Sequence, residues 1–158
     1  MDTNMSLSLG FKGQLKLNAQ AVPLQEGYLK LGGIAAENLT FGVVCSAPAA
    51  DPTAIVKGKG DGNVIRGIVV FDDAIAQNAP AHPNTYLKDM PCAFVNKGLV
   101  KIMSWESGKD PVIGYKVQYA DATGVIGFVA SSADASHTLL EGATVVEVTD
   151  DGAYVWLS

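Results

Sequence analysis

The chain has 158 residues, of which 48% are hydrophobic and only 17% charged, and its formal net charge is −5. This length is enough for one domain with a substantial hydrophobic core, while the acidic balance and the scattered basic residues argue against direct binding of DNA or RNA. No run approaches the roughly 20 apolar residues of a membrane-spanning helix, so we expect no membrane contact.

The first patterned segment lies near the N-terminus. Phe11 and Leu15 share one parity, whereas Lys12 and Lys16 take the other. A period of two is typical of a half-buried strand. Residues 1–20 are therefore predicted to form an arm or edge strand, which pairs with its own sheet or with a neighbouring subunit.

Strand-like runs then recur between turn signals along the rest of the chain. They cover residues 27–34, 39–45, 55–56, 65–71, 93–95, 99–102, 115–120, 125–130, 144–148 and 153–157. This spacing predicts an all-β fold, a single β-sandwich or jelly-roll-like domain over residues 1–158. Short helical turns are expected at residues 74–77 and within 131–142.

Two turns are predicted from their residues. Asn96-Lys97-Gly98 favours a hairpin between the runs at 93–95 and 99–102, and Asp151-Gly152 favours a second hairpin near the C-terminus. Trp156 is expected to anchor the last strand in the core.

The two cysteines, Cys45 and Cys92, lie in separate apolar runs without the CxxC spacing of a zinc site. We interpret them as buried free thiols, although only geometry decides whether they pair. The N-terminus lacks the basic start and apolar run of a signal peptide, so synthesis in a reducing cytoplasm is expected.

Few residues suggest chemistry. Asp72 and Asp73 are neighbours, so on a strand they point to opposite faces, and a helix cap or strand-end turn is the favoured interpretation. The alternative is a calcium site that also uses Asp61 or Asp89.

The histidines and the glycine-rich loop also lack the spacing of known catalytic or phosphate-binding motifs. His82 and His137 have no partner at HExxH spacing, and Ser136, His137 and Asp134 are too close in sequence to favour a hydrolase triad. The glycine-rich loop at 58–63 lacks the spacing of a phosphate-binding loop. The sequence thus predicts no catalytic residues, no metal and no cofactor.

Three aromatic residues leave two interpretations open. Trp105, Tyr115 and Tyr119 could form a sugar-binding platform, but alternation along a strand favours a core position for the two tyrosines. Trp105 is then a candidate for a protein interface.

A longer pattern resembles a known family. Phe41-Gly42-Val43-Val44 is followed by Gly67-Ile68-Val69 and then by Pro91, Val95, Gly98 and Val100. This order is similar to that of the capsid cement (decoration) proteins of tailed bacteriophages, over roughly residues 22–102. The resemblance implies a non-catalytic structural protein of the virion, made in the bacterial host cytoplasm.

The resemblance also implies a partner and a place. Such a protein sits on the outer surface of the phage head, stabilises contacts between major capsid protein subunits, and self-associates there as a dimer or trimer. The expected interface residues are Phe11, Lys12, Pro80, His82, Pro83, Tyr86 and Trp105. The alternative function is a carbohydrate-binding β-sandwich module on a virion or cell surface, whose glycan binding would need Trp105 or Tyr115.

Overall fold

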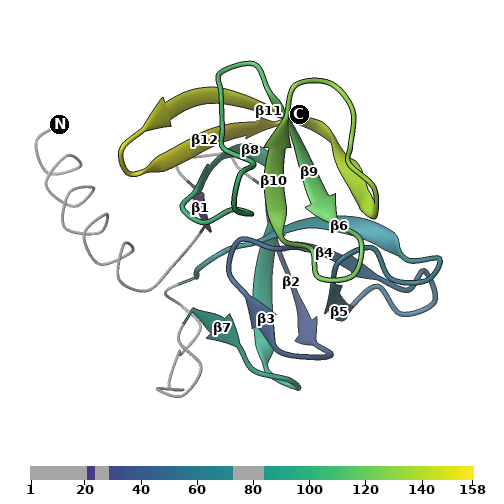
Figure 1. Ribbon diagram of the computed structural model, residues 1–158. Coiled ribbons are helices and arrows are strands. Elements are labelled where there is room, and N and C mark those ends of the chain that lie inside the picture. The colour runs from purple at the N-terminus through teal and green to yellow at the C-terminus, as the bar shows by residue number, and fades with distance from the viewer. Residues whose placement is uncertain (1–20, 24–28, 73–83) are drawn as a thin grey trace, which may run out of the picture.

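The computed structural model describes residues 21–23, 29–72 and 84–158, and every regular element in these ranges is a β-strand (Figure 1). The all-β prediction is therefore confirmed. The arm expected at residues 1–20 and the helical turn expected at 74–77 lie outside the described residues. The strands are β1 (Ala21–Pro23), β2 (Leu29–Ala35), β3 (Leu39–Thr40), β4 (Val44–Ala47), β5 (Ala54–Lys57), β6 (Val64–Val69), β7 (Thr85–Tyr86), β8 (Pro91–Ile102), β9 (Lys116–Ala120), β10 (Ile126–Val129), β11 (His137–Thr149) and β12 (Gly152–Leu157).

Five strands close into a ring. Their order is β8-β2-β5-β4-β6, and β6 pairs again with β8. A sheet whose last strand pairs with its first is a barrel. Its closure includes one short parallel contact, in which Ile34 and Ala35 of β2 pair with Ala54 and Ile55 of β5. The described strands are thus partly barrel-like, and the expected sandwich or jelly roll is not confirmed.

Strand β8 belongs to two sheets. Its first half pairs with β2 and β6 in the barrel, whereas Gly98–Ile102 pairs with β12 in the order β10-β9-β11-β12-β8. The predicted hairpin at Asn96-Lys97-Gly98 is wrong, because the chain continues through these residues in one strand. A local turn signal is overridden here because β12 offers residues 98–102 a partner further along the chain.

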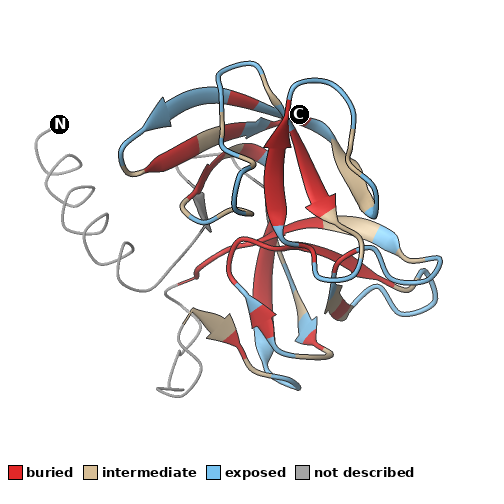
Figure 2. Cartoon of the chain, viewed as in Figure 1, coloured by how far each residue is buried: buried red, intermediate tan, exposed pale blue. Residues whose placement is uncertain are grey.

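Two further predictions, both for the C-terminal sheet, are wrong. The helical turn expected within 131–142 is wrong, because Thr138 and Leu139 pair with β9 as part of β11. The β11–β12 hairpin is confirmed, but Trp156 is 41% exposed and does not anchor its strand. Val155 and Leu157 take the buried positions, so alternation turns Trp156 outward. Figure 2 shows that the β11–β12 hairpin has exposed stretches mainly on β11 and buried stretches mainly on β12.

The barrel and the C-terminal sheet are joined by backbone hydrogen bonds. Val44 N donates to Gly124 O over 2.8 Å across the junction, while Val44 O accepts from Gly58 N over 2.8 Å within the barrel. Lys59 N also donates to Asp121 O over 2.8 Å. The turn between β9 and β10 is therefore held against β4 and the end of β5.

Candidate protein–protein interface

Two of the seven predicted interface residues lie within the described ranges. The other five, Phe11, Lys12, Pro80, His82 and Pro83, lie outside them. Tyr86 is only 2% exposed; its hydroxyl donates to Val70 O over 2.6 Å, and its ring packs edge-on against Phe41. Tyr86 is thus a core residue in this conformation, and we do not include it in the interface proposed below.

Trp105 is partly buried. Its Nε1 donates to Asp110 Oδ1 over 3.1 Å, and its ring lies edge-on to Phe128 with the centroids 5.7 Å apart. Tyr119 is buried, as predicted, and Tyr115 packs partly buried against the core. These three aromatic side chains therefore contribute to packing, and the described surface offers no specific support for a sugar-binding platform built from them.

The C-terminal sheet exposes a group of apolar side chains that we call the sheet patch: Ile113, Val146 and Trp156. They are 61%, 44% and 41% exposed. Backbone hydrogen bonds bring the segment of Ile113 and the strands of the other two residues together, because Gly114 N donates to Val145 O over 2.8 Å and Thr144 pairs with Trp156. Exposed apolar groups that gather in this way mark contact surfaces more often than isolated ones do.

A second group, the barrel patch, consists of Ile34 and Met90, both about half exposed. Ala35 N donates to Met90 O over 2.9 Å, and Ile34 pairs with Pro91 at the start of β8. Figure 1 shows this end of β8 at the bottom of the barrel, far from the β11–β12 hairpin.

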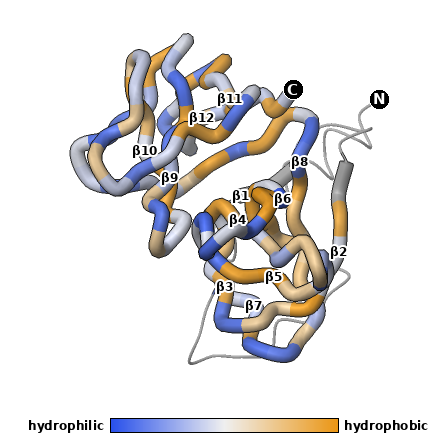
Figure 3. Tube along the Cα trace, turned by 90° about the vertical axis from the view of Figure 1, so that its right-hand side faces the viewer, coloured by the Kyte–Doolittle hydropathy of each residue, from blue (hydrophilic) through white to orange (hydrophobic). Residues whose placement is uncertain are grey.

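The two patches lie beside opposite ends of β8. Ile34 is opposite Pro91 and Trp156 is opposite Leu99. Eight strand residues at about 3.3 Å each separate them by roughly 25 Å. Figure 3 shows hydrophobic stretches along β8 and β12, so one strand links both ends of the molecule through its apolar core.

Sequence reasoning missed both patches. A signal for Trp156 was present, because Ala153, Val155 and Leu157 are aliphatic at every second position and leave Tyr154 and Trp156 on the other face. Ile34 and Met90 carried no such signal, because they come together only through the pairing of β2 with β8.

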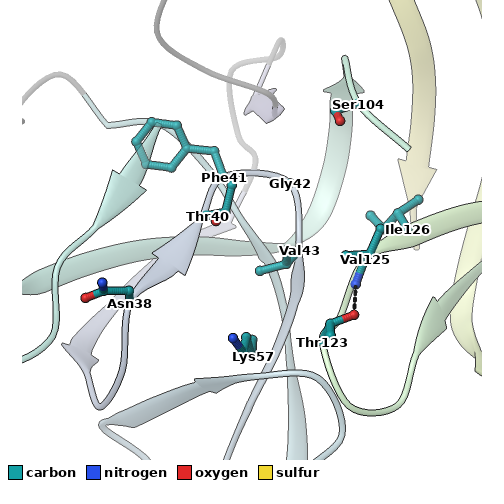
Figure 4. A pocket seen from close by; sticks show the side chains of 10 residues that line it. All are labelled: Asn38, Thr40, Phe41, Gly42, Val43, Lys57, Ser104, Thr123, Val125 and Ile126. Atoms are coloured by element: carbon teal, nitrogen blue, oxygen red, sulfur yellow. Dashed lines mark hydrogen bonds between the residues drawn. The ribbon is translucent and has the colours of Figure 1, made fainter. Parts of the chain in front are cut away.

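A shallow hollow of about 200 Å³ separates the barrel from β10 (Figure 4). Two of its polar side chains already accept hydrogen bonds from the backbone. Asn38 Oδ1 accepts from Lys88 N over 2.9 Å, and Thr123 Oγ1 accepts from Val125 N over 3.4 Å. Lys57 is the one ionisable side chain among its lining residues. General acid–base catalysis usually relies on a pair of positioned ionisable groups, and a hollow lined by a single one gives no specific support for a catalytic site.

His137, the first residue of β11, belongs to a cluster of charged side chains that we call the clamp: Glu106, Lys109, Asp134 and His137. Its Nε2 lies 2.9 Å from Glu106 Oε2 and its Nδ1 lies 2.7 Å from Ala135 O. Beside it, Lys109 Nζ lies 2.7 Å from Asp134 Oδ2. Since both ring nitrogens face acceptors, neither is left to take a proton from Ser136, and the triad considered from sequence is not formed.

We expect this clamp to stabilise the fold mainly at acidic pH. The Ala135 carbonyl and then Glu106 raise the pKa of His137 above its ordinary value. Stabilisation is therefore complete below about pH 6.5 and is lost as the pH rises through the raised value. His137→Ala should lower the free energy of unfolding, measured in urea, more at about pH 5.5 than at about pH 9.

Glu106→Gln serves as the matched control, because it keeps the shape of the partner but removes its charge. Glu106→Gln should reduce the pH dependence of the free energy of unfolding that His137 causes. Asp134 and Lys109 remain beside the ring in this variant. Equal losses for His137→Ala at both pH values would contradict this account.

The two thiols are buried and free, as predicted. Burial raises the pKa of Cys92 to about 11 and raises that of Cys45 as well. Both groups therefore remain protonated at neutral pH, which makes them poor nucleophiles.

The described residues contain neither a cluster suited to a metal ion nor a helix suited to a membrane. No three His, Cys, Asp or Glu side chains within 29–72 and 84–158 gather as a metal site, and this gives the calcium alternative no support there. The same part of the chain has no helix of the length and hydrophobicity needed to cross a bilayer.

An all-β framework whose exposed apolar groups gather in patches is typical of proteins that act by contacting other proteins. The comparison with known families agrees: the model for "Structural cement protein (E217 gp24/Pam3 gp6)" matches residues 2–158. The chain belongs to this family of phage structural cement proteins, and the resemblance stated from sequence is confirmed. No curated protein matches it.

Proposed function

We propose that this protein binds the outer surface of the phage head and stabilises contacts between neighbouring major capsid protein subunits. The observation that carries the proposal is the pair of apolar patches along β8, one on the barrel and one on the C-terminal sheet. Membership of the cement family supplies the context of the virion.

Two separated patches suit a protein that bridges a joint. Once one patch is bound, the second contact becomes intramolecular, and the combined affinity exceeds that of either contact alone by about 10²–10⁴. The buried apolar area contributes roughly 25 cal/mol per Å², less the entropy of association. A joint held in this way opens only when one of the contacts is broken.

The remaining features fit the same role. A net charge of −5 suits a position outside the shell and disfavours binding to the packaged DNA. Self-association as a dimer or trimer would bring several patches to one symmetry axis of the head. Trp105 and the predicted arm at residues 1–20 remain proposed additional contacts.

The test is binding of the purified protein to heads of its phage that have been stripped of it. Trp156→Ser and Met90→Ser each remove an exposed apolar anchor from one patch. Each should weaken binding by about 100-fold, because the loss of one contact also removes the advantage of bridging. The measurement is cosedimentation over a range of protein concentrations, on variants shown to unfold as the unmodified chain does.

Val125→Ser is the matched control, because Val125 is 38% exposed but belongs neither to a patch nor to the lining of the groove described below. It should bind as the unmodified protein does. Unchanged binding by both patch variants would contradict the proposal, and so would cryo-electron microscopy that finds no density for this chain at joints between capsid subunits.

A further inference from the structure

A groove of about 390 Å³ lies where β8 leaves the barrel to join the C-terminal sheet. Its lining includes Ile65–Gly67 of β6, Thr138–Glu141 of β11, and Leu157 of β12. In Figure 1 the start of β11 lies beside β6. Neither patch described above belongs to this groove.

The β6 and β11 segments are strand edges with an open side. β6 pairs with β8 only at Ile68 and Val69, so Val64–Arg66 has β4 on one side and no other strand among the described residues. β11 pairs with β12 only from Ala143 on, so Thr138–Glu141 likewise has no described strand opposite β9. Open strand edges are templates for the addition of a further strand.

Arg66, one of the residues that line the groove, has an unused hydrogen-bond donor. Arg66 is the bulged residue of β6, and its guanidinium lies 5.3 Å from the centroid of the Phe94 ring. Its Nε is buried and has no hydrogen-bond partner among the described residues. A buried donor without an acceptor is costly, so a ligand that brings an acceptor is favoured.

Charge and hydrophobicity define that ligand. Lys59 and Arg66 contribute two positive charges to the groove, against one negative charge from Glu141. A carboxylate is therefore the acceptor that gains most, while Ile65, Leu139 and Leu157 offer contact to an aliphatic side chain. In an extended segment these two kinds of side chain alternate.

We propose that this groove accepts an extended acidic and aliphatic segment of a partner protein as an added β-strand. The identification of that partner as a capsid subunit rests on the proposed function. The strand-accepting property itself does not, since it follows from the two open edges, the unused Arg66 donor and the charge of the groove.

The direct probe is an acetylated peptide of about eight residues that alternates valine with glutamate, compared with its glutamine counterpart. The glutamate peptide should bind the full chain about tenfold more tightly. Arg66→Gln should remove this preference, whereas Lys97→Gln, an exposed cation on β8 outside the groove, should keep it. Equal affinity of both peptides for the unmodified chain would overturn the inference.

Hydrogen exchange distinguishes an added strand from contact by side chains alone. Within residues 64–66 and 138–141, the amides that point away from β4 and β9 should exchange rapidly in the free chain and become protected when the glutamate peptide binds. The same pattern is expected when the chain is bound to phage heads. Peptide binding without protection of these amides would show that no strand is added, and the inference would be wrong.

The outcomes also separate this inference from the proposed function. If the chain binds heads while both edges stay unprotected, the groove is not the capsid contact and the proposed function still stands. If the chain does not bind heads but the glutamate peptide protects both edges, the proposed function fails and the groove inference stands. The two edges could also be protected only when the chain self-associates, which sedimentation would detect. In that case the occupant of the groove is a second copy of the chain, and the inference is wrong.

Discussion

Gly124→Ala is expected to lower the free energy of unfolding by more than about 3 kcal/mol. Gly124 has a φ of 75°, a conformation that costs an alanine about 1–2 kcal/mol. In addition, the new Cβ would collide with the carbonyl oxygen of Val44 and would lie 2.8 Å from Gly58 N. These two atoms cannot move freely, because they form a backbone hydrogen bond with each other inside the barrel, and Val44 N donates to Gly124 O across the junction with the C-terminal sheet.

Gly62→Ala is the matched control for this prediction. Gly62 has a similar φ of 70°, but a Cβ there would meet nothing within 4 Å. Only the conformational cost of about 1 kcal/mol is then expected. Urea denaturation of the two variants measures the difference, and equal losses would show that the junction yields to accommodate the extra atom.

Local patterns were enough to predict much of the secondary structure. Alternating apolar residues located β9 and the β11–β12 hairpin, and Asp151-Gly152 correctly marked its turn. The interpretation of Cys45 and Cys92 as buried free thiols was also correct. These features depend on neighbours in sequence, which is the information that a period of two contains.

Barrel closure depends on contacts that no local pattern contains. The ring needs β2 to pair with β5 in parallel through only two residue pairs, and β6 to return to β8. The turn signal at Asn96-Lys97-Gly98 was real as a local preference. It was overridden because β12, more than 50 residues later in the chain, pairs with residues 98–102.

The predicted interface residues stay a prediction, and local patterns could not show which strand faces are exposed, for a related reason. Tyr86 and Trp156 are both large aromatic residues on strands, yet one is buried and the other exposed. Which face of a strand turns inward follows from its register, and register is fixed by the partner strand. The family resemblance correctly indicated a structural role but contained no information on which surface makes contact.

The second large effect is expected at Phe41, a fully buried residue between two other rings. Its centroid lies 5.9 Å from that of Phe71 and 4.9 Å from that of Tyr86, both in edge-on geometry. Phe41→Ala should therefore cost about 4 kcal/mol, since it removes both ring contacts and leaves a cavity. For a chain of this length, thermal unfolding should shift down by roughly 10 °C.

Phe41→Leu tests whether the cost comes from the cavity, because leucine refills most of the volume and should recover more than half of the lost stability. Phe41 belongs to neither apolar patch, so Phe41→Ala studied below its unfolding midpoint should still bind phage heads. If the patches provide the affinity for phage heads and the core provides the stability of the fold, substitutions in the core should lower stability without weakening binding. If Phe41→Ala unfolded at the same temperature as the unmodified chain, the aromatic cluster would not be what holds this end of the barrel together.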